Sequence, residues 1–473
     1  MTIYALSTPP GRAGVAVIRI SGPDVLKVWK GMVRTTAGGA KKGKQREQEP
    51  ESWKMHRCRV VDPISGNLLD DGLVVFFKAP KSFTTENVLE LHIHSGRAVI
   101  SSVLHALSLF PFCRPAEPGE FTRRAFEGER LDLTQVEGLK DLIDAETESQ
   151  RRAALMAAGG VTRNRFEELR TEIIHCLAFV EALIDFGEDE DIEEARERVL
   201  KLIHIIETHL ADSRRGEIMR SGIRLAIFGP PNAGKSSLLN FLAQREAAIV
   251  TSIPGTTRDI LELSLDIGGL PVIIADTAGI RKTVDLIEQI GVERARQLVK
   301  SADVALCVLS LPDIVGDNES QSSVRIPQSV APLITSETYL LLNKTDMVDV
   351  TPERINCIRD AAGAAKAWAV SLTTNKGTQG FLDGFAGALL KRYDLMQEGG
   401  TNQNEPLVTH ARQRVHLENA LQFLNAFLSY QPNDVVFSAE ELRYAAQAVG
   451  KISGLIDVED VLDALFRDFC IGK

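Results

Sequence analysis

Eight residues near the middle of the chain have the composition of a phosphate-binding loop. Residues 229–236 read Gly-Pro-Pro-Asn-Ala-Gly-Lys-Ser, with an apolar segment before them and leucines at helical spacing after them. In such a loop, glycines let backbone N–H groups turn onto phosphates, the lysine brings a cation to the β and γ oxygens, and the serine hydroxyl can bind magnesium. We therefore predict phosphate contacts, with Ser236 as a magnesium ligand, from Asn232, Ala233, Gly234, Lys235, Ser236 and Ser237.

Two later motifs turn a general nucleotide site into a guanine-nucleotide site. Residues 276–279 follow an apolar segment, so their aspartate can reach the metal and their glycine N–H the γ-phosphate. After another apolar segment, the Asp346 carboxylate can accept two parallel hydrogen bonds from guanine, a pattern that adenine does not offer. Residues 371–373 are a weaker candidate for the loop that closes over the base, and a plain loop is the alternative. These contacts are Asp276, Thr277, Ala278, Gly279, Asn343, Lys344, Asp346, Ser371, Leu372 and Thr373.

Composition restricts the remaining function classes. The chain has 473 residues, enough for about three domains. Its 54 Lys and Arg against 64 Asp and Glu give a net charge of -10, which argues against extensive coating of nucleic acid. A local basic patch could lie within 41–46, where a solvated loop is the favoured interpretation, or within 214–224. Cysteines without metal-ligand spacing favour a reducing compartment, and without a membrane-length apolar run we expect a soluble chain.

Periodicity divides the chain into four segments. Residues 1–118 show strand patterns at 15–20, 73–77 and 88–93 and a helix over 99–109, which predicts an α+β domain. Helical periodicity follows over 119–220 and returns over 397–473, on either side of an α/β block at 221–396. The simplest packing joins the two helical segments in one bundle. We thus predict a multidomain α/β plus α protein, with a Ras-like P-loop GTPase domain inserted into a helical domain.

Two further features have an ordinary structural explanation when they are taken alone. His92 and His94 alternate on one predicted strand and lack a third ligand, so we interpret them as strand histidines. Asp457 begins a final amphipathic helix that leads to Cys470 near the end of the chain. A thiol at a helix C-terminus faces the negative end of the dipole, which disfavours the thiolate. By itself this pattern favours a structural cysteine.

Several motifs together resemble the MnmE (TrmE) family of tRNA-modification GTPases along essentially the whole chain. They comprise residues 9–12 (Pro-Pro-Gly-Arg), 18–22 (Ile-Arg-Ile-Ser-Gly), 118–121 (Pro-Gly-Glu-Phe), 124–126 (Arg-Ala-Phe), the GTPase block and the terminal Cys-Ile-Gly-Lys. Residues 3–8 and 145–152 look most similar to the mitochondrial, fungal-type branch, and a bacterial origin is the alternative. The resemblance therefore implies either the mitochondrial matrix or the bacterial cytoplasm.

The resemblance implies a substrate, cofactors and partners. Family members act as homodimers with the flavoprotein MnmG, which brings FAD and NADH. With it they add a 5-carboxymethylaminomethyl-type or taurinomethyl-type group to the wobble uridine of tRNA. The one-carbon unit comes from 5-formyl- or 5,10-methylene-tetrahydrofolate, and residues 1–118 would form the folate-binding and dimerisation domain. Which amine is used, glycine or taurine, stays open.

Folate-site residues can be transferred from the family one at a time. Arg19, Glu90, Arg130 and Lys473 match the folate positions, and Cys470 matches the tail cysteine implicated in the modification. Arg130 stands where bacterial members carry lysine, which keeps the charge but changes its geometry. Residues 85–87 read Thr-Glu-Asn instead of Gly-Glu-Asp, and residues 94–96 read His-Ser-Gly instead of His-Gly-Gly. Both departures flank Glu90 and could alter the pocket.

The same resemblance addresses GTP hydrolysis. Many small GTPases orient water with a glutamine after the Asp-x-x-Gly motif, where this chain has Ile280. The family pattern makes Asn232 a potassium ligand together with Thr251, Ile253 and Thr256, and Thr257 a magnesium ligand. It gives Glu288 the task of orienting water through a bridge. By sequence alone, a solvated helix glutamate is a strong alternative explanation for Glu288. This switch segment adds the GTP contacts Thr251, Ser252, Ile253, Pro254, Gly255, Thr256 and Thr257.

Two rival classes share parts of this pattern. An Era-like or Der-like ribosome-assembly GTPase should carry a KH-type RNA module, but no Gly-x-x-Gly loop in a matching βα context occurs outside the GTPase block. A structural GTPase that acts as a dimerisation switch would explain the flanking helices. It would leave the N-terminal segment and the tail unexplained.

Overall fold

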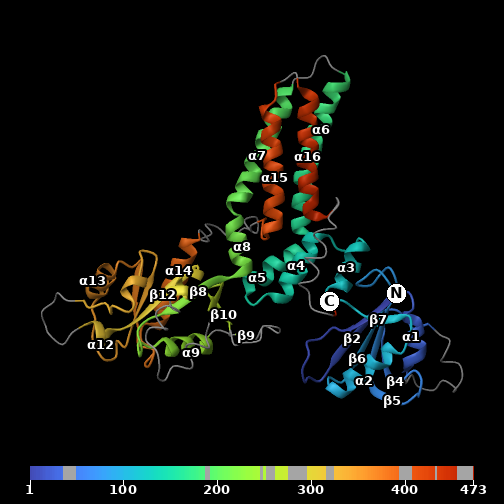
Figure 1. Ribbon diagram of the computed structural model, residues 1–473, viewed down its shortest axis with the longest axis horizontal. Helices are drawn as coiled ribbons and strands as arrows, with labels where there is room; N and C mark the ends of the chain where they lie inside the picture. Colours follow the sequence, from blue (N-terminus) through green and yellow to red (C-terminus); the bar gives the residue numbers. More distant parts are fainter. Residues whose placement is uncertain are drawn as a thin grey trace. The chain divides into compact units, whose positions relative to one another are not determined.

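The computed structural model describes residues 1–35, 49–186, 192–245, 249–251, 262–274, 296–315, 324–393, 407–431, 434–454 and 472. The chain divides into two compact units. Figure 1 labels the helices and strands of both. The first unit comprises Met1–Lys140, Gly160–Glu167 and Val449–Lys473, and the second comprises Asp141–Gly159 and Glu168–Ala448. None of the helices in these described ranges is long and apolar enough to cross a membrane.

A seven-stranded sheet of order β3-β4-β5-β6-β2-β1-β7 organises the first unit. All neighbours in it pair antiparallel except β1 and β7. Helices α1 (Val25–Met32) and α2 (Arg97–Ser108) share one apolar core with one face of the sheet. The strands are β1 (Thr2–Leu6), β2 (Ala16–Ser21), β3 (Val33–Thr35), β4 (Met55–Val61), β5 (Leu68–Phe77), β6 (Val88–Ile93) and β7 (Cys113–Pro115).

Alternation along the two central strands decides which side chains leave the core. In β2, Ile18 and Ile20 are buried in the core shared with α1 and α2, whereas Arg19 lies between them and faces the other side of the sheet. The register of β2 and β6 places Arg19 directly opposite Glu90. Helices α3 (Glu120–Glu127) and α4 (Leu133–Asp144) follow β7, and Phe121 of α3 packs on Ile3 of β1. The second face of this sheet is therefore where polar chemistry is possible.

The α/β part of the second unit is a seven-stranded sheet of order β14-β13-β12-β8-β11-β10-β9. Five strands are parallel, and β10 and β9 extend the sheet antiparallel. Helices α9 (Lys235–Arg245) and α14 (Thr378–Arg392) pack in one core cluster, and α12 (Leu311–Ile314) and α13 (Pro352–Ala362) pack in another. A short 3-10 helix spans Ala331–Leu333. The strands are β8 (Ile223–Phe228), β9 (Ile249–Thr251), β10 (Glu262–Ile267), β11 (Leu270–Ile274), β12 (Val304–Ser310), β13 (Tyr339–Asn343) and β14 (Lys366–Ala369).

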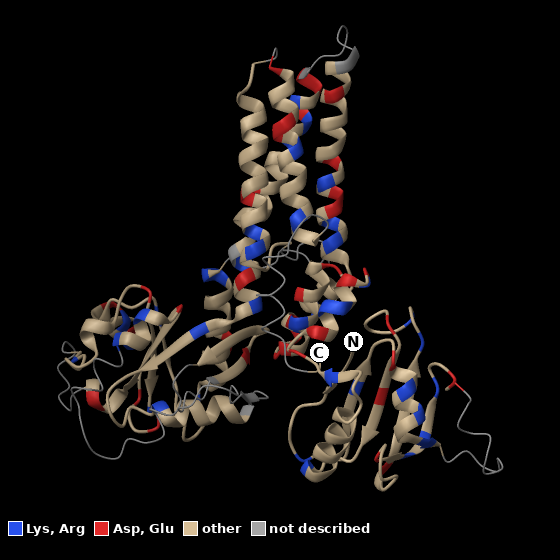
Figure 2. Cartoon of the chain, turned by 45° about the vertical axis from the view of Figure 1, so that its right-hand side comes forward, with Lys and Arg blue, Asp and Glu red and all other residues tan. Residues whose placement is uncertain are grey.

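Helices that precede the α/β segment in the chain pack against helices that follow it. Residues of α7 contact α15, and Arg196 Nη2 of α7 donates to the Leu428 carbonyl at 2.8 Å. Arg443 of α16 forms an ion pair of 2.8 Å with Glu181 of α6. Acidic and basic residues are interspersed along these helices (Figure 2). The helices are α5 (Glu148–Ala158), α6 (Val161–Phe186), α7 (Ile192–Ala211), α8 (Ser213–Ser221), α15 (Ala411–Ser429) and α16 (Val435–Ser453).

Candidate functional sites

The phosphate-binding loop connects β8 to α9, as its sequence predicts. Helix α9 begins at Lys235, so its N-terminal turn, which includes Ser236 and Ser237, lies directly beside the loop. Asn232 has φ 58 and Gly234 has φ 106, two left-handed conformations that fold the loop sharply. A Cβ on Gly234 would collide with the Asn343 side chain, so only glycine fits there. This geometry suits backbone contact with an anion.

Lys235 is folded over this loop. Its Nζ donates hydrogen bonds to the Gly229 carbonyl at 2.8 Å and the Pro230 carbonyl at 2.7 Å. Burial lowers the pKa of Lys235 from its ordinary value. Burying an ammonium group in a protein disfavours its charge, and a phosphate beside it would offset that cost. The loop thus holds a cation where the motif requires it.

Asn343 links the base-recognition motif to two other loops. Its Nδ2 donates to the Ala233 carbonyl of the phosphate loop at 2.9 Å, and its Oδ1 accepts from the Leu372 backbone N–H at 3.2 Å. A hydrogen bond with Ser371 holds the pKa of Asp346 below its ordinary value. The structure therefore brings the weakly predicted segment 371–373 into contact with both ends of the Asn-Lys-Thr-Asp motif.

Of the predicted switch residues, only the backbone of Thr251 is described; it ends β9, opposite Glu262 of β10. Several other predicted site residues lie outside the described residues, and their roles stay predictions. They are Ser252, Ile253, Pro254, Gly255, Thr256, Thr257, Asp276, Thr277, Ala278, Gly279, Glu288, Cys470 and Lys473.

A pocket of about 560 Å³ lies in the first unit and includes two of the predicted folate residues, Glu90 and Arg130. Arg19 is beside them, because its Nε donates to Glu90 Oε1 at 3.0 Å across the β2–β6 pair. Both side chains of this ion pair are at least four-fifths buried. The pocket is lined by Trp53, Phe77, Pro80, Lys81, Ser82, Phe83, Thr85, Val88, Glu90 and Arg130.

The ring of Phe83 contacts both arginines of the site. The guanidinium carbons of Arg19 and Arg130 are each 5.1 Å from the centroid of its ring, within the range of cation–π attraction. Arg130 Nη1 donates to the Ser82 carbonyl at 2.7 Å, and no carboxylate of the described residues forms an ion pair with it. Burial, and then the charge of Arg19, lower the pKa of Arg130. This arrangement leaves an excess of positive charge that favours an anionic ligand.

Glu90 is ionised at neutral pH in this environment. Burial by itself would raise its pKa, but His92 and Arg19 together hold the pKa below its ordinary value. His92 Nε2 is 3.6 Å from Glu90 Oε2. An ionised carboxylate can accept further hydrogen bonds from a ligand.

The two strand histidines are placed differently from the prediction. Strand β6 ends at Ile93, so His94 lies beyond it and its backbone N–H and ring both contact Asp70. The prediction that both histidines alternate on one strand face is therefore wrong, because only His92 lies within β6. Within the described ranges, no group of three or more metal-binding side chains comes together.

Trp53 and Ser82 are pocket residues that the sequence pattern did not indicate. The Trp53 side chain is 65% exposed and its ring is 4.7 Å from that of Phe77 in an edge-on contact. Trp53 belongs to no apolar repeat, so its exposure is visible only in the tertiary structure. Ser82 contributes through its backbone carbonyl, which carries no sequence signature.

The last described residue, Gly472, lies at the end of β1. The Ser7 hydroxyl donates to the Gly472 carbonyl at 2.9 Å. Gly472 has φ 97, and a Cβ there would collide with the Leu6 carbonyl. The penultimate position of the chain is thus anchored to the first unit through a contact that tolerates only glycine.

Comparison with known proteins identifies the family of this chain. Residues 2–130 match the family model described as "GTP-binding protein TrmE N-terminus", and residues 133–470 match the one described as "MnmE helical domain". The tRNA modification GTPase MnmE of Parvibaculum lavamentivorans is 44% identical over 100% of both chains. The mitochondrial 5-taurinomethyluridine-[tRNA] synthase subunit GTPB3 of Danio rerio is 41% identical over 100% of this chain and 93% of the relative. The chain therefore belongs to the MnmE (TrmE) family of tRNA modification GTPases.

Proposed function

We propose that this protein is a potassium-dependent GTPase that modifies C5 of the wobble uridine in tRNA with a flavoprotein partner and tetrahydrofolate. The observation that carries the proposal is the similarity over the full chain to proteins named tRNA modification GTPase MnmE. It covers both the α/β block with its phosphate loop and the unit with the cationic pocket. The Era-like and Der-like alternatives account for the first of these parts only.

The residues of the phosphate loop suit GTP and its ions. Lys235 and the N-terminus of α9 would hold the phosphates, and Asp346 would select guanine with support from Ser371. Ser236 and Thr257 would hold magnesium, whose charge offsets that of the phosphates. The exposed Asn232 offers an amide oxygen, a ligand type suited to potassium, with Thr251, Ile253 and Thr256 as further ligands. Glu288 would orient the attacking water.

The pocket of the first unit suits a reduced folate. Its volume of about 560 Å³ falls within the range of small-molecule sites. The ionised Glu90 can pair with pterin N–H donors, whereas Arg19 and Arg130, with Lys473 from the tail, suit the folate carboxylates. Phe83 offers an aromatic ring in contact with both arginines. A bound tetrahydrofolate derivative would supply the one-carbon unit of the modification.

We further infer that the GTPase domain at 221–396 is inserted between 119–220 and 397–473 of one helical domain. The contacts of α7 with α15 and of α6 with α16 support this inference. Residues 1–118 would form the folate-binding and dimerisation domain. The relatives include mitochondrial proteins from Danio rerio and Dictyostelium discoideum as well as bacterial proteins, so both localisations are proposed.

The first expected result concerns the ion. GTP turnover should be faster in potassium than in sodium by about tenfold or more, because a cation held at the phosphates offsets negative charge that develops during hydrolysis. The Asn232→Ala variant should turn over GTP at one slow rate in both salts. Asn240→Ala, an exposed change on α9, is the matched control and should keep the potassium effect. Equal wild-type rates in the two salts would contradict the ion assignment.

The second expected result concerns the tRNA. In cells that lack their own family member, this chain should restore a C5-substituted wobble uridine, measured by nucleoside mass spectrometry. Lys235→Ala should not restore it, because the phosphates lose their cation and GTP hydrolysis drives the reaction. The mass of the nucleoside will also show whether glycine or taurine is incorporated. If the Lys235→Ala variant restores the modified nucleoside to the wild-type level, the tRNA modification does not depend on GTP hydrolysis.

A further inference from the structure

The loop between β5 and β6 supplies much of the pocket wall. Ser82, Phe83 and Thr85 from this loop line the pocket. The loop is closed by a bond of 3.0 Å from the Ala79 N–H to Asn87 Oδ1, and inside it the Ser82 hydroxyl donates to the Glu86 carbonyl. Thr85 has φ 63, a conformation that β-branched residues avoid. Contacts outside the loop must therefore hold it in this shape.

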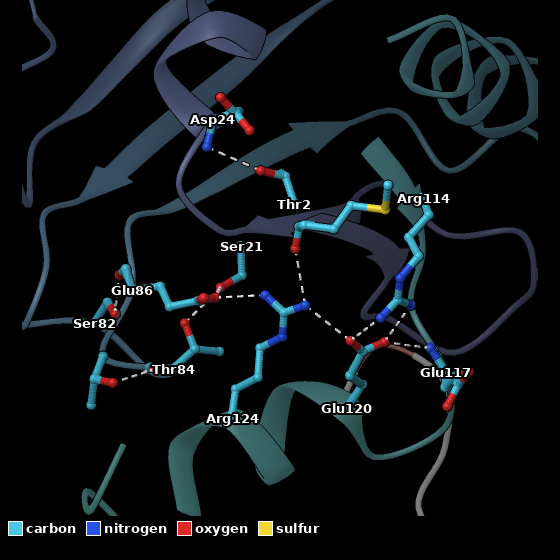
Figure 3. A network of polar contacts seen from close by, with 12 residues as sticks. Thr2, Ser21, Asp24, Ser82, Thr84, Glu86, Arg114, Glu117, Glu120 and Arg124 are labelled. Carbon is cyan, nitrogen blue, oxygen red and sulfur yellow. Dashed lines mark hydrogen bonds and ion pairs between the residues drawn. The ribbon is translucent and has the colours of Figure 1, made fainter. Parts of the chain in front are cut away.

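Glu86 makes the strongest of these outside contacts. Its Oε2 accepts hydrogen bonds from the Ser21 hydroxyl and from Arg124 Nη1, both at 2.8 Å (Figure 3). The Ser21 hydroxyl also lies 2.6 Å from the Thr84 hydroxyl, and both residues are buried. One carboxylate thus ties the loop to the end of β2 and to helix α3.

Arg124 is itself held from the other side. Its Nη2 donates to Glu120 Oε1 at 3.0 Å and to the Met1 carbonyl at 3.1 Å. Glu120 forms a two-bond ion pair with Arg114 of β7 (Figure 3). Burial opposes the charge of Glu120, but Arg114 and Arg124 hold its pKa below the ordinary value. The result is a row of alternating charges, Arg114, Glu120, Arg124 and Glu86, in which Arg124 is only 15% exposed.

We propose that Glu86 and Arg124 are positioning residues for the folate pocket, although neither lines it. Their ion pair sets the loop so that the Ser82 carbonyl holds Arg130 and the Phe83 ring contacts both Arg19 and Arg130. Without the pair, the loop can leave its unfavourable conformation at Thr85, and the two arginines lose their common partner. This inference rests on the proposed function, because it assumes that the pocket binds a reduced folate.

Titration with 5-formyltetrahydrofolate tests the proposal, with Trp53 in the pocket wall as a fluorescence reporter. Glu86→Gln keeps the shape of the side chain but removes its charge, and it should weaken binding by about 3- to 30-fold. The matched control is Arg123→Gln on helix α3, next to Arg124. It breaks the exposed ion pair of Arg123 with Glu127 and should leave folate binding unchanged. GTP turnover and the melting temperature of each variant are measured in parallel on the full chain.

A double-mutant cycle separates positioning from general destabilisation. Glu86→Gln and Arg124→Gln together should weaken binding no more than the worse single variant, because both remove the same pair. If Arg124→Gln does not fold, Arg124→Lys replaces it, since lysine keeps the charge but loses the forked geometry. Wild-type affinity in Glu86→Gln, or losses that simply add, would overturn the proposal. A wild-type chain that hydrolyses GTP but fails to bind 5-formyltetrahydrofolate would instead remove the folate assignment on which it rests.

Discussion

Asp346→Asn is expected to reduce GTP affinity by about 10³-fold or more while creating affinity for xanthosine triphosphate. Asp346 can accept hydrogen bonds from both guanine N1–H and the exocyclic amine, and Ser371 keeps its pKa low, so the carboxylate is ionised. In asparagine, one acceptor becomes an NH₂ donor that opposes the guanine amine. Xanthine has a carbonyl oxygen in place of the exocyclic amine of guanine, and this oxygen can accept a hydrogen bond from the asparagine NH₂ group. A site built to hydrogen-bond its ligand rejects a ligand that mismatches one such bond by large factors.

Displacement of a fluorescent guanine nucleotide by each triphosphate measures this change. Asp349→Asn removes another exposed carboxylate three residues along the chain and is the matched control. Its affinity for GTP should stay within about twofold of wild type, because an exposed charge away from the base contributes little. An Asp346→Asn protein that still prefers GTP would show that guanine is selected elsewhere.

Cys470→Ser is expected to hydrolyse GTP at the wild-type rate yet lose wobble-uridine modification by about 10³-fold or more. The physical argument from the helix dipole favours a structural cysteine, whereas the family resemblance gives this thiol a part in the modification. Serine is close in size but is a far weaker nucleophile than a thiolate near neutral pH. A reactive thiol and a structural one therefore predict opposite results for the same substitution.

Nucleoside mass spectrometry of tRNA from cells that carry only the variant decides between them. Cys357→Ser, on an exposed cysteine of α13, controls for loss of a thiol as such and should leave the modified nucleoside at its wild-type level. The anchor at Gly472 offers a second comparison, because Gly472→Ala keeps Cys470 but introduces a Cβ against the Leu6 carbonyl. Persistent modification with Cys470→Ser would make the tail cysteine structural.

The local elements of the GTPase block were predictable because their signals are local. Strand β8 is the apolar segment that precedes the loop, and the loop and the start of α9 follow from glycine spacing and helical periodicity. The apolar residues before segments 343–346 and 371–373 lie in or next to β13 and β14. Backbone geometry of this kind depends on neighbours in the chain. The weaker segment 371–373 had no such signal, and its link to Asn343 appears only when β13 and β14 pair.

The pocket of the first unit shows where local information ends. Residue types and family pattern singled out Arg19, Glu90 and Arg130, but no spacing rule joins positions so far apart in the chain. The antiparallel register of β2 and β6 pairs the first two, and the loop held by Glu86 brings Phe83 and Ser82 to the third. The amino-acid sequence by itself thus determined the family, the nucleotide motifs and most helices and strands, because these depend on short-range patterns of residues. Only tertiary structure decided which charges are buried together, because burial and pairing depend on strands and helices that meet through long-range packing.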